Sequence, residues 1–271
     1  MNKHVPMNPF NQAAALVHDA LTGFNESASP VSRASRASLE CLISAKAALP
    51  SQTANPPPTI AAAPGSKAER LEQLRQRVLP CAKCPHLLAR RSHVVFGVGN
   101  PEAELMFVGE APGEDEDLQG EPFVGKAGQL LTKIIEAMGL TRNDVYIANV
   151  LKCRPDMPPG ESGNRKPRPE EMATCLPHLM EQIEIIAPKC IVALGATAME
   201  GLLGQPVVMR DVRGRWHSFK GTPLMATYHP AYLLRNQSLS EKRKVWEDML
   251  QVLKKLEHPI SAKQQGYFLA K

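Results

Sequence analysis

Long hydrophobic runs are missing from this chain of 271 residues, and no window holds eighteen successive apolar residues. A helix that crosses a bilayer needs about 20 such residues, so the sequence argues against a membrane-spanning helix. The N-terminus also lacks a basic start followed by an apolar run, which disfavours a secretory signal. We therefore expect a cytoplasmic protein without a membrane partner.

Two nucleotide-binding motifs are absent as well. No G-x-G-x-x-G follows a predicted strand and no G-x-x-x-x-G-K-[S/T] occurs, which disfavours a redox or nucleotide-binding α/β protein. The formal net charge of +5 is a mild basic excess that does not by itself indicate nucleic acid. Six cysteines in a chain without an export signal are better explained as thiols or metal ligands than as disulfides.

The first 65 residues differ in composition from the rest. They carry seven charged side chains and are rich in Ala, Ser, Asn and Pro. Such a segment buries too little apolar area to offset chain entropy, so we predict a disordered, low-complexity N-terminal extension over 1–65. Order is predicted from Ser66, because Ser66 and Glu69 have the spacing of a capping box. This leaves one domain at 66–260 and a C-terminal tail at 261–271.

Apolar runs of strand length alternate with helical patterns in that domain. The runs are Leu105–Val108, Val145–Val150, Cys190–Leu194 and Leu224–Thr227, and the helical patterns are Ala127–Met138, Pro169–Ala187, Ala196–Leu203 and Ser240–Leu256. This alternation is typical of a parallel sheet with helices on both faces. We predict a three-layer α/β/α fold with a central, mainly parallel four-stranded sheet.

Polar and glycine-rich motifs follow the predicted strands. They are Gly109-Glu110-Ala111-Pro112-Gly113 with the acidic run Glu114–Asp117 and the run Gln119–Gly125, then Asn149 before Lys152-Cys153-Arg154-Pro155, Gly195-Ala196-Thr197, and Tyr228-His229-Pro230. Ligands of open α/β sheets bind beyond the carboxyl ends of the strands. We therefore expect these motifs to meet in one site.

Four cysteines of the domain are candidate metal ligands: Cys81 and Cys84 in a C-x-x-C, then Cys153 and Cys175. Four thiolates could hold zinc or an iron–sulfur cluster, and the spacing does not distinguish the two. Unligated core cysteines are the remaining explanation. Cys190 begins an apolar run and is predicted to be a small core residue, whereas Cys41 lies in the N-terminal extension.

The joint order of these motifs resembles the family 4 uracil-DNA glycosylases over roughly residues 67–257. The resemblance implies a monomeric, monofunctional enzyme that flips uracil out of single- or double-stranded DNA. It would hydrolyse the N-glycosidic bond and leave an abasic site, which initiates base excision repair. It also implies a [4Fe-4S] cluster with a structural role, held by Cys81, Cys84, Cys153 and Cys175. The segment Asp156–Gly163 looks like an insertion relative to the family.

Three side chains of the motifs fit recognition of an extruded uracil. Phe123 could stack on the flipped ring, because every base presents a flat π face. Asn149 could accept a hydrogen bond from uracil N3–H and donate one to O4, a pattern that cytosine reverses. His229 could donate to O2 as negative charge builds on the leaving base. By composition alone, each has an ordinary structural explanation: a core ring, a turn residue and a structural histidine.

The group that activates the water is the least defined. In family 1 enzymes an aspartate follows the glycine and glutamine of the first motif, and the matching residue here is Ala111. The resemblance places Gly109 and Ala111 at the substrate, assigns Glu110 to organising the water or the site, and assigns Glu116 to crowding the place of a thymine methyl. Most of the acidic run is expected to be a solvated loop.

DNA contacts are expected from the later part of the chain. From residue 205 to the end, twelve Lys and Arg face five Asp and Glu, and phosphate contacts dominate affinity for DNA. We predict Leu233 or Leu234 as a wedge that fills the vacated stack and Arg235 as a phosphate contact. Both leucines could instead pack in the core.

Two related functions remain open. One is a non-catalytic iron–sulfur DNA-binding module that associates with a DNA polymerase or repair complex. The other is the covalently trapping relative of the family, which carries a glutamine in the Gly-Glu-x-Pro-Gly motif and a histidine before its last cysteine. In this chain Ala111 stands where that relative has its glutamine, and residues 156–174 contain no histidine. We therefore expect an enzyme that turns over.

Overall fold

The structure is a computed structural model that describes residues 65–158, 160–161 and 163–269. The disorder predicted for 1–65 therefore falls, apart from Gly65, outside the described residues, as does Cys41. Ser66 caps the first described helix, α3 (Lys67–Val78), and its hydroxyl accepts from the backbone of Glu69 while the Glu69 carboxylate accepts from Ser66 N. The predicted capping box is confirmed.

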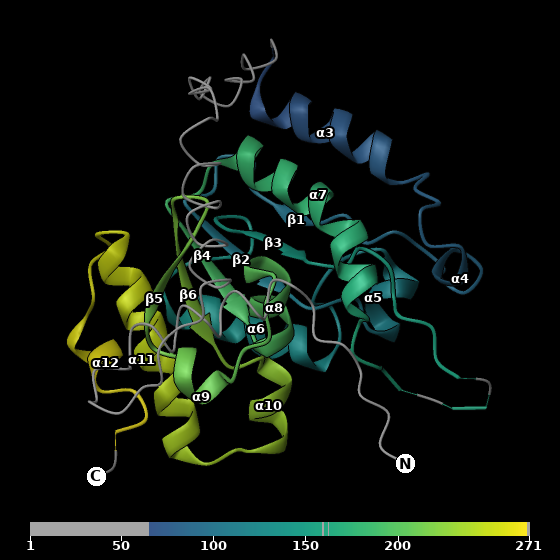
Figure 1. Cartoon of the computed structure of the whole chain (residues 1–271). Helices are drawn as coiled ribbons and strands as arrows, with labels where there is room; N and C mark the ends of the chain where they lie inside the picture. Colours follow the sequence, from purple (N-terminus) through teal and green to yellow (C-terminus); the bar gives the residue numbers. More distant parts are fainter. Residues whose placement is uncertain (1–64, 159, 162, 270–271) are drawn as a thin grey trace, which may run out of the picture. The chain divides into compact units, whose positions relative to one another are not determined.

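One sheet of six strands runs through the described residues, in the order β1-β3-β2-β4-β6-β5 (Figure 1). The four central strands are parallel to one another: β3 (Tyr146–Asn149), β2 (Leu105–Gly109), β4 (Cys190–Leu194) and β6 (Thr222–Thr227). These are the four predicted strands, and the mainly parallel α/β fold is confirmed.

The predicted number of four strands was too low, because two antiparallel edge strands complete the sheet: β1 (Val98–Gly99) and β5 (Trp216–Phe219). Neither has the apolar run from which the central strands were predicted. β1 has only two residues, and in β5 only Phe219 is buried. Edge strands are covered on fewer sides, so their sequences carry a weaker signal.

Helices cover both faces of the sheet, which gives the predicted three layers (Figure 1). Leu105 and Phe107 of β2 pack in one core with α6 (Lys126–Ala137) and α11 (Leu239–Lys255). Met106 and Val108 point to the opposite core, which α3, α7 (Pro169–Ile186) and α8 (Ala196–Leu203) share. The alternation follows from the period of two in a strand. The predicted helical patterns are confirmed.

Short helices lie mainly in the connections between these elements: α4 (Pro85–Leu88), α5 (Glu114–Gln119), α9 (Met209–Val212), α10 (Pro230–Arg235) and α12 (Ala262–Gln265). Gly204 ends α8 with a φ of 68°, the left-handed conformation in which glycine commonly terminates helices. None of the described helices is long and apolar enough to span a membrane.

The last helix, α12, lies in the segment predicted as a C-terminal tail and packs against the domain. Trp246 Nε1 donates to the carbonyl of Gln264 over 2.6 Å, and the Gln264 side chain donates to the carbonyl of Ala137 over 3.0 Å. The Arg243 guanidinium donates to the carbonyls of Gln265 and Tyr267. These bonds attach the tail to α6 and α11.

Candidate active site

The carboxyl ends of the central strands meet at one edge of the sheet. Gly109 at the end of β2 pairs with Asn149 at the end of β3. On the other side, Gly195 N donates to the carbonyl of Thr227 over 2.8 Å, two residues before His229. The parallel order of the strands thus brings together motifs that are far apart in the sequence, as expected for this class of fold.

A cavity of about 130 Å³ opens at this edge. Its walls are Ala111, Gly113, Glu116, Phe123, Ala127, Asn149, Asn164, His229 and Ala231. An engineered protein cavity of roughly 150 Å³ accommodates one benzene ring, so this cavity has the size of a single small ring. The three side chains predicted to recognise uracil all line it.

Phe123 forms an aromatic wall of the cavity. Its ring centroid lies 5.7 Å from that of His229, with 31° between the ring planes. Gly109 lets the ring come close, because a Cβ at Gly109 would lie 2.5 Å from Phe123 Cζ and 2.3 Å from Asn149 Oδ1. Any side chain at position 109 would therefore displace two of the cavity's walls. The Phe123 backbone has a φ of 56°, in the left-handed region that bulky residues rarely adopt.

Asn149 presents an unpaired acceptor to the cavity. The residue is 2% exposed, and its Oδ1 has no hydrogen-bond partner among the described residues. Buried polar atoms in proteins almost always have a partner, and an orphan atom marks the position of a missing one. The geometry therefore calls for a ligand N–H beside Oδ1.

His229 has a defined tautomer. The backbone N–H of Ala231 donates to its Nδ1 over 3.1 Å, so Nδ1 is the unprotonated nitrogen and Nε2 carries the hydrogen. Burial, with a smaller contribution from Arg235, lowers the pKa of His229 to about 4. The ring is therefore neutral at physiological pH and offers Nε2–H as a donor.

The acidic run was predicted as a solvated loop, and the structure corrects this. The run forms the first turn of α5, where carboxylates interact favourably with the helix N-terminus. Glu116 Oε1 accepts from the backbone N–H groups of Val124 and Gly125, at 3.0 and 2.9 Å, and its Oε2 accepts from Gly113 N. Buried Asp117 accepts from Ser92 N. Glu116 thus lines the cavity and also holds the loop that carries Phe123.

A larger groove of about 370 Å³ adjoins the cavity and shares the walls Ala111, Asn164 and His229 with it. Glu110 lines this groove but not the ring-sized cavity. Burial raises the pKa of Glu110, and the Thr197 hydroxyl and Lys166 oppose the shift. Glu110 therefore lies beside the ring site. Because its pKa is raised, its carboxyl group binds a proton more readily than that of an exposed glutamate.

Asn164 is the site residue that the sequence did not predict. It follows the predicted insertion and lines both the cavity and the groove. The next residue, Arg165, donates to the Asp156 backbone and to both oxygens of buried Glu171, which fixes the loop. One signal was available in the sequence: this loop joins Cys153 and Cys175, two of the candidate metal ligands, so both of its ends are placed by predicted functional residues.

Comparison with known proteins agrees with this geometry. The profile described as the uracil DNA glycosylase superfamily matches residues 96–250. The Type-4 uracil-DNA glycosylase of Thermotoga maritima is 47% identical over 188 residues, 68% of this chain and 93% of that protein. The Type-4 enzyme of Archaeoglobus fulgidus is 42% identical over a match that covers 64% of this chain and 88% of that protein. The one of Sulfurisphaera tokodaii is 40% identical, and the match covers 74% of this chain and 91% of that protein. The chain belongs to the type-4 uracil-DNA glycosylases. The predicted family is confirmed.

Four of the cysteines lie near one another: Cys81, Cys84, Cys153 and Cys175. Cys81 and Cys84 precede α4, Cys153 follows β3 and Cys175 lies on α7. Burial raises the pKa of Cys175 to about 11, and the neighbouring Cys153 and Cys81 add to the shift. Cys190 is fully buried in β4, so its prediction as a core residue is confirmed.

The spacing of the thiols can be compared with the spacing that a single zinc ion requires. Thiolates on one tetrahedral zinc ion, with Zn–S bonds of about 2.3 Å, lie about 3.8 Å from one another. Within the described part of the chain, no three cysteine sulfurs lie within 4.8 Å of one another; the one such group of ligand atoms belongs to His86, Asp156 and Glu171. The thiols are therefore less closely gathered than the ligands of one tetrahedral zinc ion, and four cysteine sulfurs are a donor set that an iron–sulfur cluster can take.

Two N–H donors point at cysteine sulfurs of this site. Arg91 Nη1 donates to Cys153 Sγ over 3.1 Å, and Lys152 N donates to Cys175 Sγ over 3.2 Å. Hydrogen bonds of this kind stabilise thiolates in metal sites. Lys152 itself is buried, its Nζ donates to Gln182 Oε1, and burial lowers its pKa to about 7. The sulfurs of Cys153 and Cys175 thus each accept an N–H bond that favours the thiolate, against the burial that raises the pKa of both thiols.

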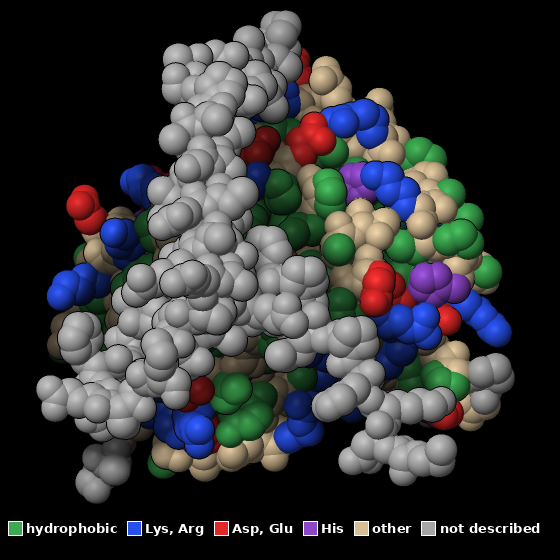
Figure 2. Space-filling view, in the orientation of Figure 1, with side chains coloured by type: hydrophobic (Ala, Val, Ile, Leu, Met, Phe, Trp, Pro, Cys, Tyr) green, Lys and Arg blue, Asp and Glu red, His purple; other side chains and the backbone are tan. Residues whose placement is uncertain are grey.

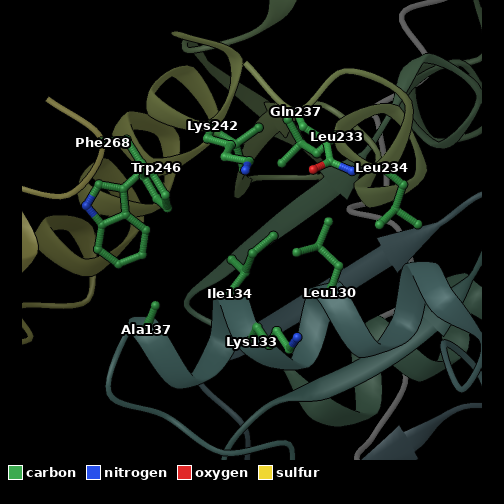
Figure 3. Close-up of a pocket in the computed structure, with 11 residues that line it drawn as sticks. Leu130, Lys133, Ile134, Ala137, Leu233, Leu234, Gln237, Lys242, Trp246 and Phe268 are labelled. Atoms are coloured by element: carbon green, nitrogen blue, oxygen red, sulfur yellow. The ribbon is translucent and has the colours of Figure 1, made fainter. Parts of the chain in front are cut away.

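The predicted DNA contacts lie on α10. Leu233 is 5% exposed and Leu234 is 39% exposed, so only Leu234 is free to enter DNA. Both leucines line an apolar cavity of about 330 Å³ that α6, α10 and α11 enclose, with Ile134 and Trp246 among its walls (Figure 3). Arg235 is exposed and lines the groove next to the ring-sized cavity.

Some basic side chains of the later part of the chain are paired with carboxylates. Arg213 pairs with buried Asp248 over 2.8 Å, and Lys244 pairs with Glu241 over 2.6 Å. On the described part of the face in Figure 2, basic side chains stand in separate groups with acidic side chains between them. Arg213 and Lys244 are thus engaged within the fold, while the excess of twelve Lys and Arg over five Asp and Glu already includes both of their partners.

Proposed function

We propose that this chain is a monofunctional uracil-DNA glycosylase that extrudes uracil and hydrolyses its N-glycosidic bond. The observation that carries the proposal is the ring-sized cavity in which the orphan Asn149 acceptor and the His229 Nε2–H donor face the Phe123 ring. These are one acceptor, one donor and a stacking surface. All three groups belong to the same cavity.

Recognition rests on Asn149. A base inside a duplex is out of reach, so the nucleotide must leave the stack. In the cavity, uracil N3–H would satisfy Asn149 Oδ1, and the amide Nδ2 would donate to O4. Cytosine presents an acceptor at position 3 and a donor at position 4, so both of its contacts would be mismatched.

Bond cleavage rests on His229. As the bond between C1′ and N1 breaks, its electron pair stays on the base and negative charge grows at O2. The neutral Nε2–H of His229 would stabilise that charge, as donors in oxyanion holes do. Water then forms the new bond to C1′, and its proton passes through the groove to Glu110 or solvent. Because the sugar is cationic at this stage, a weak base such as Glu110 suffices. The amide of Asn164, which lines both the cavity and the groove, would hold the water in place.

Contacts outside the cavity support extrusion. We propose Leu234, the exposed member of the leucine pair, as the wedge in the vacated stack. Arg235, which borders the groove, would bind a phosphate next to the extruded nucleotide.

Thymine would be excluded inside the cavity. Glu116 lines the cavity and would crowd the 5-methyl group of thymine.

The thiol site would hold a [4Fe-4S] cluster through Cys81, Cys84, Cys153 and Cys175. When bound, the cluster supplies structural cross-linking and no step of the hydrolysis. It would join α4, the end of β3 and α7, and thereby fix the loop that carries Asn164.

Replacing one ligand is expected to remove the cluster. Cys153→Ala should abolish the brown visible absorbance and lower bound iron from about four atoms per chain to near zero, because three thiolates no longer complete the site. Cys190→Ala, a change of equal size in a buried strand, should leave iron content unchanged. Equal iron in both variants, or equal loss, would contradict the assignment.

Base release tests the function. The chain, loaded with its cluster, is incubated with an oligonucleotide that contains one uracil, and free uracil and alkali-labile sites are measured. We expect both, without strand cleavage before alkali. Binding to the oligonucleotide with no uracil released from U·G, U·A or single-stranded substrate would instead favour the non-catalytic DNA-binding module.

A further inference from the structure

We propose that Arg142, which lies outside the cavity, is a positioning residue that holds the Phe123 backbone in the conformation that presents its ring to uracil. The proposal rests on the proposed function and deepens it. No role for Arg142 follows from the strand-end motifs, because the residue lies in the connection between α6 and β3.

The Phe123 backbone needs an external restraint. Five non-glycine residues among those described have a positive φ, and of these only Phe123 lines the ring-sized cavity. A bulky side chain in the left-handed region is disfavoured and persists only where surrounding contacts over-determine it. Release of the backbone to an ordinary φ would swing the ring away from its place beside Gly109.

Arg142 supplies that restraint through two backbone carbonyls. Its Nη2 donates to the Pro122 carbonyl over 2.9 Å, and its Nη1 donates to the Phe123 carbonyl over 3.2 Å. Nη1 also lies 3.3 Å from Thr132 Oγ1, which in turn donates to the Gly128 carbonyl. The guanidinium therefore ties the Phe123 loop to α6.

The opposite side of the loop is held by a different group. Glu116 accepts from the N–H groups of Val124 and Gly125, which follow Phe123 directly. Helix α6 packs so closely that a Cβ at Gly128 would lie 1.8 Å from the Phe123 carbonyl oxygen. Phe123 is thus fixed by a carboxylate bound to the two residues after it and by a guanidinium bound to its own carbonyl and to that of Pro122.

The electrostatic setting of Arg142 fits a carbonyl clamp better than a salt bridge. No carboxylate oxygen lies within 4.0 Å of its guanidinium in the part of the chain that the structure describes. The side chain is half-buried, and this burial lowers its pKa. The planar guanidinium of arginine presents two nitrogens to two acceptors in a fixed geometry. A lysine has only one donor nitrogen and does not reproduce this arrangement.

A double-mutant cycle tests the proposal. Arg142→Met is expected to lower kcat for uracil release roughly tenfold, because small displacements of a positioning group are costly to catalysis. Inhibition by free uracil should weaken by a similar factor, with little change in KM for the oligonucleotide. In a Phe123→Ala background the same substitution should change kcat less than about twofold, since it acts through the ring.

Arg243→Met is the matched control, because Arg243 also donates to two backbone carbonyls, but on the C-terminal segment. It should leave kcat and uracil inhibition unchanged. Should Arg142→Met fail to fold, Arg142→Lys takes its place; it keeps the positive charge but has a single donor nitrogen, so a smaller loss is expected. Equal losses of kcat with and without the Phe123 ring, or unaltered inhibition by uracil, would overturn the positioning role. Absence of uracil release by the unmodified chain would instead refute the proposed function.

Discussion

Asn149→Asp is expected to lower kcat/KM for uracil release about 10⁴-fold, because a site built to hydrogen-bond its substrate strongly rejects a mismatched partner. The carboxylate would still accept from N3–H, but it has no donor for O4 and would repel that oxygen. Single-turnover release from a uracil oligonucleotide measures the loss. Affinity for abasic-site DNA, measured by fluorescence anisotropy, should stay within about twofold, because phosphate contacts dominate it.

Asn100→Asp is the control for this change. Asn100 Oδ1 accepts from Glu102 N in the turn after β1, beside the amino end of β3 and outside the cavity lining, so the substitution alters the same chemical group without touching the cavity. It should preserve activity. Retained uracil release by Asn149→Asp would show that the orphan oxygen is not the recognition element.

His229→Ala is expected to reduce kcat about 10²–10³-fold, the usual cost of removing one donor to a developing oxyanion. KM should change little, because the hydrogen bond to O2 strengthens only as charge builds. His217→Ala removes a half-buried histidine that bonds to the Val212 carbonyl and should have no such effect. If His229→Ala raised KM and left kcat unchanged, the role of His229 in bond cleavage would be contradicted.

The pH dependence follows from the same geometry. Since burial lowers the pKa of His229 to about 4, the imidazole stays neutral above that pH. The ratio of wild-type to His229→Ala activity should therefore be constant from about pH 5.5 to 8, where an ordinary histidine with a pKa of about 6.5 would titrate. A step in that ratio near pH 6.5 would mean that the protonated ring is the active form.

Much of the site was predictable because its parts follow apolar strands. Gly109, Asn149 and His229 stand at or just after the ends of parallel strands, and apolar runs locate such strands well. Once the strands are parallel neighbours, their ends must meet. The family resemblance then assigned roles that spacing alone left open.

The parts that escaped prediction depend on tertiary contacts. Asn164 reaches the cavity because Arg165 is paired with Asp156 and Glu171, and no local pattern reports such pairing. The left-handed backbone of Phe123 depends on Arg142, nineteen residues later in the chain. The choice between Leu233 and Leu234 required the rotation of α10 about its axis, which a helix of six residues does not reveal in its sequence.

A crystal structure of the chain soaked with free uracil tests the central claim most directly. The account predicts the pyrimidine in the cavity of about 130 Å³, stacked against Phe123, with N3 and O4 at the Asn149 amide and O2 at His229 Nε2. Uracil bound in another cavity, or in this one with O2 turned away from His229, would contradict it.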